Sequence, residues 1–385
     1  MINDAILWVS NPVTLFQRVG GITVLERQLH AMRRAGLRRV WVSADQMPKA
    51  AAGLRLPVGL EVVWTNGSAP APPQCQPPYL VVSGSHFIRV ETLTHIVCHP
   101  GSARTTYLDD RQTSVVQVVP ASVDDASPGR SQLLPEGASI PLQHPIPNAP
   151  TVEWLLTTGT KSQDGFMARH FDRHISLAIS RCLLETRVSP NMMTVISSLV
   201  GLFGTSFFLI HAWGAHMTGA TLIWLHSVLD GCDGELARIR FQESPMGADI
   251  DFWGDNLVHV SLFGCLSLGF TLADHSVMPL LAGLTATVGI LGSAILVYRR
   301  RQTRRRLPAP STPESSGSLL ARVENVLEQR DFIYVLLILA YFNPDLGCTY
   351  AFMWAGAVGV ILFFAMTLHI GRLNREQEFQ PHRAS

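Results

Sequence analysis

The sequence predicts an α-helical polytopic membrane domain with about six transmembrane helices, preceded by a small α/β Rossmann-like cytoplasmic domain. Two observations support this fold class. The chain of 385 residues is 47% hydrophobic, and its long apolar runs are concentrated after position 190. The part before about residue 150 contains short runs of strand type around one amphipathic helical pattern. We therefore expect an α/β domain at 1–150, a linker with a juxtamembrane helix at 151–190, and a transmembrane domain at 191–385.

The first part is expected to form a mainly parallel sheet. Residues 21–36 have the pattern of an amphipathic helix, with Leu25, Leu29 and Met32 on one face. Strand-like runs precede and follow this helix, which is typical of a strand–helix–strand unit. These runs are 4–10, 39–43, 61–65, 79–83 and 114–119.

Two proline-rich stretches interrupt this pattern. Residues 69–78 and 120–150 are expected to be surface loops or a partly disordered linker. The acidic pairs Asp109–Asp110 and Asp124–Asp125 lie in loop-like sequence, so we expect them to be solvated.

Six apolar segments follow, most of them close to the length of about 20 residues that spans a bilayer. They are about 192–212, 217–236, 249–272, 277–298, 331–345 and 350–369. The fifth is the weakest, because Asn343, Pro344 and Asp345 end its apolar run early.

Basic residues are distributed unevenly between these segments. The connections near 211–216, 272–277 and 343–349 contain no Lys or Arg. The opposite side carries Arg238, Arg240, the clusters Arg299–Arg301 and Arg304–Arg306, and Arg372 with Arg375. By the positive-inside rule, the sequence predicts an integral protein of the cytoplasmic (inner) membrane with both termini cytoplasmic.

Four carboxylates lie at the cytoplasmic ends of two apolar segments. Asp230 and Asp233 are three residues apart, and Asp251 and Asp255 are four apart, so each pair shares one helix face. Carboxylates at membrane depth are costly unless something compensates their charge. Oxygen ligands suit hard divalent cations, so the four carboxylates favour Mg²⁺ or Mn²⁺.

The residues around these acids complete a longer pattern. It reads Asp-x2-Asp-Gly-x2-Ala-Arg-x8-Gly-x3-Asp-x3-Asp, from Asp230 to Asp255. All eight specified positions resemble the signature of the CDP-alcohol phosphotransferase (phosphatidyltransferase) family. The resemblance implies a membrane enzyme that transfers a phosphoalcohol group, of phosphatidyl or inositol-phosphate type, from a CDP-alcohol to an acceptor hydroxyl with release of CMP. It also implies a homodimer and a role in phospholipid or inositol-phosphodiester biosynthesis.

The same resemblance implies roles for individual residues. Asp230, Asp233, Asp251 and Asp255 match the metal ligands, and Asp255 matches the candidate catalytic base. The positions that shape the CDP site are matched by Gly234, Ala237, Arg238 and Gly247. Two other kinds of protein remain as alternatives, a catalytically silent membrane scaffold or regulatory protein and a transporter. The intact motif argues against the first, and the position of all four acids at one end of the helices argues against the second.

The N-terminal part resembles the first βαβ unit of sugar nucleotidyltransferases through Gly21–Leu29 and Gly36–Val40. It lacks the glycine-rich phosphate loop, and Ser83-Gly84-Ser85-His86 stands where that family carries a metal-binding Asp. We therefore expect a degenerate, non-catalytic domain. The domain order is similar to that of bifunctional inositol-1-phosphate cytidylyltransferase/di-myo-inositol-phosphate-phosphate synthases. The chain also resembles these bifunctional enzymes at further positions, which are Asp164-Gly165, Arg169, Arg173, Ser176, Pro190-Asn191 and Thr194.

Residues 167–186 read as an amphipathic helix on the membrane surface. Its Arg169, Arg173 and Arg181 are candidates for holding a phosphate on the acceptor. The six arginines between 299 and 306 have two readings, a topology determinant that contacts anionic lipid or a part of the same acceptor site.

Other features exclude some classes of protein. A net charge of +1 offers no basic field for nucleic acid. The six cysteines contain no CxxC pair, so neither a zinc site nor a disulfide framework is expected. No signal peptide is expected, because Asp4 interrupts a short apolar start. The 14 histidines have no metal-ligand spacing and are expected to be structural.

Overall fold

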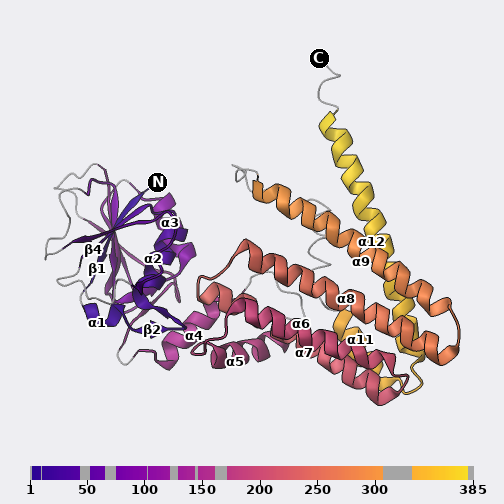
Figure 1. The fold of residues 1–385 in the computed structure, drawn as a ribbon. Coiled ribbons are helices and arrows are strands. Elements are labelled where there is room, and N and C mark those ends of the chain that lie inside the picture. The colour runs from indigo at the N-terminus through magenta and orange to yellow at the C-terminus, as the bar shows by residue number, and fades with distance from the viewer. Residues whose placement is uncertain are drawn as a thin grey trace. The chain divides into compact units, whose positions relative to one another are not determined.

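The computed structural model describes residues 2–9, 11–43, 53–65, 75–101, 103–121, 129–143, 146–160, 171–306 and 332–379. The chain forms two compact units (Figure 1). The first contains Met1–Thr160 together with Ser180–Arg187 and Glu235–Gln242. The second contains Lys161–Ile179, Val188–Gly234 and Glu243–Ser385.

A seven-stranded mixed sheet forms the centre of the first unit, in the order β10-β8-β9-β6-β1-β4-β5. The strands are β1 (Asp4–Trp8), β4 (Arg39–Ser43), β5 (Glu61–Thr65), β6 (Tyr79–Ser83), β8 (Thr105–Leu108), β9 (Ser114–Val119) and β10 (Arg130–Leu133). Strand β1 pairs in parallel with β4 on one side and β6 on the other, and β9 runs antiparallel to β6. The strand order therefore reverses at β1 and β6, where open α/β sheets place their ligand crevice.

Short helices and hairpins surround this sheet. They are α1 (Pro12–Leu15), the β2–β3 hairpin (Arg18–Val19, Ile22–Thr23), α2 (Val24–Arg34), β7 (His86–Ile88) paired with β11 (Ser139–Pro141), α3 (Val90–Cys98) and α4 (Ala149–Thr158). Helix α2 begins with a capping box in which Thr23 and Glu26 exchange hydrogen bonds. It is followed by Gly36 with a positive φ of 102°. Helices α2 and α3 pack together beside the sheet (Figure 1).

The predicted helix and strands are present, with β1 and α2 shorter than expected. Within the seven-stranded sheet, four of the six strand pairings are parallel. The expectation of loops or a disordered linker at 120–150 is wrong in part, because β10, β11 and the start of α4 lie there. All four residues of β10 are exposed, so this edge strand has no buried alternation that a sequence pattern could reveal. Most of the stretch at 69–78, and Asp124 with Asp125, lie outside the described residues.

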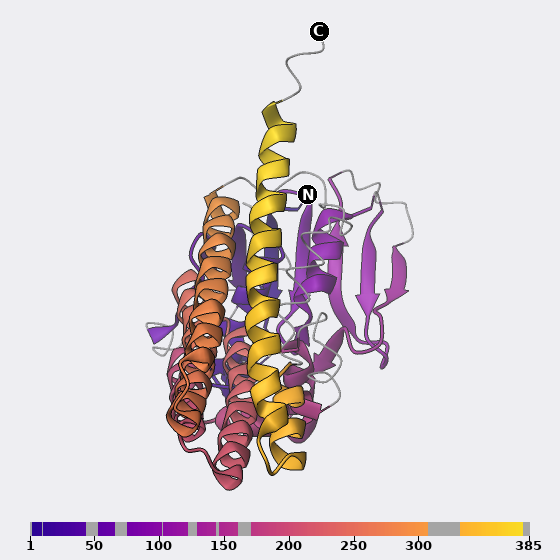
Figure 2. The same cartoon turned by 90° about the vertical axis from the view of Figure 1, so that its right-hand side faces the viewer.

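The remaining elements are helices. They are α5 (Arg173–Leu183), α6 (Pro190–Ser206), the 3-10 turn η3 (Phe207–Leu209), α7 (Trp213–Ile239), α8 (Pro245–Asp274), α9 (Met278–Arg306), α11 (Phe332–Phe342) and α12 (Gly347–Phe379). In the second unit α9 packs along both α8 and α12 (Figure 2). Its buried core includes Phe208, Leu262, Leu266, Ala286 and Met353.

Glycines allow the helices of this unit to approach closely. A β-carbon on Gly201 of α6 would lie 2.9 Å from the ring of His226 and 2.9 Å from Val258. A β-carbon on Gly289 of α9 would lie 2.8 Å from the backbone of Val360. Small residues at such crossings are typical of packed apolar helices.

Four of the expected spans are helices long and apolar enough to cross a membrane. They are Pro190–Leu209, Pro245–Asp274, Met278–Thr303 and Gly347–His369. Helix α11 is apolar but shorter, and α7 is interrupted by the buried His216 and His226. The first unit is therefore a mixed α/β domain, and the second is a helical domain with four candidate membrane spans among the described residues.

Candidate metal and donor site

Two helices of the second unit carry the four motif carboxylates. Asp230 and Asp233 lie on α7, and Asp251 and Asp255 lie on α8. Helix α8 begins at Pro245, where the Ser244 hydroxyl accepts a hydrogen bond from the backbone amide of Gly247 at 2.9 Å. This cap sets the start of α8 about two turns before Asp251, the first carboxylate of the motif on this helix.

Three of the carboxylates converge. Asp230, Asp233 and Asp251 each offer an oxygen, and these atoms lie within 4.8 Å of one another. Asp230 and Asp233 are 6% and 7% exposed, so their like charges receive little screening from water. A cluster of buried carboxylate oxygens fits a hard divalent cation in both charge and ligand type.

Helix α6 supports this cluster from one side. The hydroxyl of Thr194, itself 4% exposed, donates a hydrogen bond to Oδ2 of Asp233. Such a bond holds the carboxylate in one orientation, as residues behind metal ligands commonly do. The sequence motif Pro190-Asn191-x2-Thr194 contained this residue, but nothing in its spacing indicated the contact with α7.

Asp255 lies against a buried histidine. Nε2 of His226 is 3.6 Å from Oδ1 of Asp255, and Nδ1 of the same ring is 2.9 Å from the carbonyl oxygen of Ser197. A carbonyl only accepts, so Nδ1 carries a proton and Nε2 faces the carboxylate. Sequence reasoning treated His226 as structural, although its position inside an apolar run was the signal that could have singled it out.

The glycine at 247 is explained by packing. A β-carbon at this position would lie 2.9 Å from Oδ1 of Asn191 and 3.0 Å from the hydroxyl of Ser244. A β-carbon at 247 would therefore have to displace the side chain of Asn191, which approaches the start of α8 closely.

The end of the motif on α7 belongs to the first unit. There Nε of Arg238 donates to the carbonyl oxygen of Gly159 at 2.5 Å. Ala237 and Arg238 are both half-buried. They follow Asp230 and Asp233 on one continuous helix, at offsets of seven and eight from Asp230 that return to the same face.

The candidate acceptor arginines have different environments. Arg169 lies outside the described residues. Arg173 is the first residue of α5. Arg181, on the same helix, is paired with Glu153 at 3.8 Å, and both side chains are largely exposed. Such an exposed pair contributes little to stability.

A further buried carboxylate was missed. Asp172 is 8% exposed, and its Oδ1 accepts hydrogen bonds from Nε1 of Trp224 at 3.2 Å and from the hydroxyl of Tyr334. These contacts tie the start of α5 to α7 and α11. A lone acid in an amphipathic stretch gave no sign of them.

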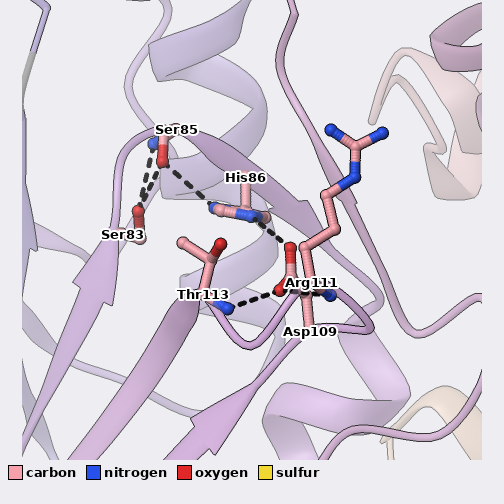
Figure 3. A network of polar contacts seen from close by, with 6 residues as sticks. All are labelled: Ser83, Ser85, His86, Asp109, Arg111 and Thr113. Carbon is pink, nitrogen blue, oxygen red and sulfur yellow. Dashed lines mark hydrogen bonds and ion pairs between the residues drawn. The ribbon is translucent and has the colours of Figure 1, made fainter.

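A polar chain occupies the carboxyl end of β6 in the first unit (Figure 3). The hydroxyls of Ser83 and Ser85 are 2.7 Å apart, Ser85 Oγ is 3.1 Å from Nδ1 of His86, and Nε2 of His86 is 3.2 Å from Oδ2 of Asp109. The backbone amides of Arg111 and Thr113 donate to the other oxygen of Asp109. Asp109 is only 6% exposed, so the expectation that it is solvated is wrong.

The protonation of this chain follows from its surroundings. Burial lowers the pKa of His86, against the opposing effect of Asp109. Burial would raise the pKa of Asp109, but the amide of Thr113, the ring of His86 and the amide of Arg111 together lower it. At neutral pH a neutral His86 therefore donates from Nε2 to an ionised Asp109.

The crevice between β1 and β6 is bridged by backbone. The amide of Gly84 donates to the carbonyl oxygen of Trp8 at 2.7 Å, and a β-carbon on Gly84 would lie 2.8 Å from that oxygen. Asp109 is the acid that these contacts bring to the turn Ser83-Gly84-Ser85-His86. It is already bound by His86 and by the backbone amides of Arg111 and Thr113.

Comparison with known proteins finds a match for the helical part. Residues 187–365 match the model of the CDP-alcohol phosphatidyltransferase family. Two similar curated proteins are both named bifunctional IPC transferase and DIPP synthase. The protein of Rubrobacter xylanophilus is 38% identical over 135 residues, which is 34% of this chain and 30% of that protein. The protein of Thermococcus kodakarensis is 30% identical over 186 residues, which is 48% of this chain and 40% of that protein.

The chain thus covers less than half the length of either relative. Among solved structures, the phosphatidylinositol phosphate synthase (PgsA1) of Mycobacterium tuberculosis with CDP-DAG bound aligns with a TM-score of 0.40. The alignment has 20% identity over 51% of this chain and 92% of that chain.

Proposed function

We infer that residues 187–365 form a domain of the CDP-alcohol phosphatidyltransferase family, whose model they match. From this membership we propose that the chain is a metal-dependent CDP-alcohol phosphotransferase of the cytoplasmic membrane. It transfers a phosphoalcohol group from a CDP-alcohol to an acceptor hydroxyl and releases CMP. The observation that carries this proposal is the convergence of Asp230, Asp233 and Asp251 within 4.8 Å, on the motif typical of the family.

The carboxylates of the motif would hold Mg²⁺ or Mn²⁺, as two ions, with Asp255 completing the ligand set. Bound divalent cations would neutralise the diphosphate and the charge that develops on CMP as it leaves. Gly234, Ala237, Arg238 and Gly247 are assigned to the CDP moiety, where the Arg238 guanidinium can meet a phosphate.

Asp255 is assigned as the general base. Its carboxylate accepts the proton of the acceptor hydroxyl, and the acceptor oxygen forms a bond to the β-phosphorus of the donor. The bond between that phosphorus and the oxygen bridging to the α-phosphate breaks, and its electrons leave with CMP. His226, whose Nε2 lies 3.6 Å from Oδ1 of Asp255, would hold the carboxylate in position for this step when both ring nitrogens carry a proton.

The nature of the donor follows from similarity alone. Relatives named bifunctional IPC transferase and DIPP synthase favour an inositol-phosphate donor over a phosphatidyl donor. Arg169, Arg173 and Arg181 are assigned to a phosphate on the acceptor. The first domain would be non-catalytic, since a serine-rich turn stands where the resembled nucleotidyltransferases carry a metal-binding acid.

The membrane arrangement is also part of the proposal. Helices α7 and α11 would cross the bilayer with the four longer spans, giving six. The polar interruptions His216 and His226 of α7 are 1% and 2% exposed, so neighbouring helices already shield them from lipid. Both termini and the active site would face the cytoplasm, and two copies would form a homodimer.

The experiment is Mg²⁺-dependent CMP release by the purified full chain. CDP-diacylglycerol and CDP-inositol are offered separately, each with a panel of polyols and polyol phosphates. Asp251→Asn should abolish release. Asp249→Asn is the matched control on the same helix, because Asp249 is bound to Arg305 at 2.9 Å and lies outside the motif.

Release from one donor names the substrate class. Absence of release from every pair, or equal release by Asp251→Asn, would contradict the proposed enzyme and favour the scaffold.

A further inference from the structure

The last turns of α7 are packed among residues of the N-terminal domain, within the first unit. Residues 235–242 include Arg238, the arginine of the motif, and end in a turn where Phe241 has a positive φ of 53°. Phe241 is stacked on the ring of His30 at 5.4 Å, and the guanidinium of Arg34 lies over it at 4.5 Å. Both partners belong to α2, at opposite ends of one helical turn.

Arg27 of α2 binds the end of α7 directly. It is 4% exposed, with Nη1 donating to the carbonyl oxygen of Ile239 at 2.5 Å and Nη2 donating to that of Val19 at 2.9 Å. The carbonyls of the last helical turn have no partner within the helix. They also carry the negative end of the helix dipole, so a buried cation at this position caps α7.

A second arginine caps the neighbouring helix. Nη2 of Arg240 donates to the carbonyl oxygens of Leu183, Leu184 and Thr186, where α5 ends. The hairpin between β2 and β3 leaves room for it, because a β-carbon on Gly21 would lie 3.0 Å from Nε of Arg240. Gly21 also has a positive φ of 86°, which glycine adopts without cost.

Helix α4 supplies a third contact. Gly159 accepts the hydrogen bond from Nε of Arg238, and a β-carbon on Gly159 would lie 2.9 Å from Cδ1 of Ile239. The side chain of Arg238 is thus oriented by a backbone carbonyl of the N-terminal domain, and the side chain of Ile239 packs closely against Gly159.

Buried charge is costly, and the arrangement compensates it. Burial and the nearby Arg240 lower the pKa of Arg27 to about 9, with Glu185 acting in the opposite direction. Arg27 therefore stays protonated at neutral pH, and its two carbonyl acceptors lower the cost of desolvating its charge. A charge held in this way is sensitive to position, because the acceptors are specific atoms of two separate elements.

We propose that the N-terminal domain positions the end of α7 for the donor, and that Arg27 is the positioning residue. Its contact with Ile239 fixes the turn from which Arg238 projects, and Gly159 orients the Arg238 guanidinium. This inference rests on the proposed function, in which Arg238 meets the CDP moiety. It assigns a role to a domain whose ligand crevice is bridged by backbone.

The kinetic test compares Arg27→Met, Arg27→Lys and Arg33→Met in the full chain. Arg33 is the matched control, since it lies on α2 but its Nε donates to the carbonyl of Val58 at 3.1 Å. Arg27→Met should raise the KM for the CDP-alcohol by about tenfold or more, since small displacements of a binding group are costly. The KM for the acceptor should stay unchanged, Arg27→Lys should recover part of the loss, and Arg33→Met should behave as wild type.

A second measurement does not depend on activity. Backbone hydrogen exchange of residues 236–242 should accelerate in Arg27→Met relative to Arg33→Met, while exchange in β1 and β4 stays the same. Gly159→Leu should produce the same local effect and the same rise in donor KM without removing a buried charge.

If hydrogen exchange at 236–242 is unchanged in both Arg27→Met and Gly159→Leu, the positioning role is overturned, whatever the activity of these variants. Equal changes in the donor and acceptor KM, or a uniform loss of kcat alone, would also overturn it. Absence of activity in wild type would contradict the proposed function and leave the exchange result to decide the inference.

Discussion

Nε2 of His226 lies 3.6 Å from Oδ1 of Asp255, and the opposite nitrogen of the ring is 2.9 Å from the carbonyl oxygen of Ser197. The ring therefore connects the backbone of α6 through α7 to a carboxylate on α8. It is 2% exposed, and Gly201 leaves the space that it fills. Such a contact limits the orientations open to the carboxylate that is assigned as the base.

We predict that His226→Phe lowers kcat by about tenfold, because Asp255 loses the partner that orients it. Phenylalanine keeps the ring in the space left by Gly201 but has no nitrogen. The measurement is CMP release under saturating donor and acceptor, with donor KM measured separately. His216→Phe is the control, since His216 lies on the same helix and is equally buried. Equal loss in both variants would indicate a general effect on packing.

Thr194→Val should weaken metal binding. The hydroxyl donates to Asp233, and residues behind metal ligands commonly change affinity by about 10–100-fold when removed. The Mg²⁺ concentration for half-maximal activity should rise, while kcat at saturating Mg²⁺ changes little. Thr205→Val serves as the control, because Thr205 is buried on α6 but donates to the carbonyl of Leu202. An unchanged Mg²⁺ dependence in Thr194→Val would contradict the supporting role.

Gly247→Ala should raise the donor KM, because the added methyl lies 2.9 Å from Oδ1 of Asn191. Asn191→Ala should relieve this contact, so the double variant is expected to lose less than the sum of the two single losses. Gly264→Ala on the same helix is the control, since its β-carbon would meet no atom within 4 Å. Additive losses would show that the contact with Asn191 is not the reason for glycine at 247.

The stability of the N-terminal domain should fall as the pH falls below about 6.5, the pKa of an unperturbed histidine. The folded domain lowers the pKa of His86, so the unfolded chain takes up a proton there first and unfolding becomes more favourable. Asp109 acts in the same direction at lower pH, because its pKa is lowered in the folded state and its contribution is lost when it is protonated.

Hydrogen exchange in β6 and β9 of the full chain, between pH 7 and pH 5, measures this effect after correction for the intrinsic exchange rate. His86→Gln should reduce the pH dependence, since glutamine can keep a polar contact with Asp109 but does not titrate. A domain that is equally stable at both pH values, or a variant with the same slope as wild type, would contradict the prediction.

The sequence by itself determined the elements and the chemistry of the motif. Strands β4, β5, β6 and β9 have the predicted bounds, because each is a short run rich in valine, a β-branched residue that favours strands. The spacing of Asp230 with Asp233 and of Asp251 with Asp255 placed each pair on one helix face. These features are local, so a few neighbouring residues are enough to encode them.

Only the tertiary structure decided which side chains meet. It brought Asp251 to Asp230 and Asp233, placed Thr194 behind the cluster, and set His226 against Asp255. It also turned Asp109 inward to His86 and bound the end of α7 to Arg27. The two residues of each contact are far apart in the sequence, from 18 positions for Asp233 and Asp251 to 212 for Arg27 and Ile239. Helix periodicity defines a face, but which face meets which depends on the packing of the whole unit.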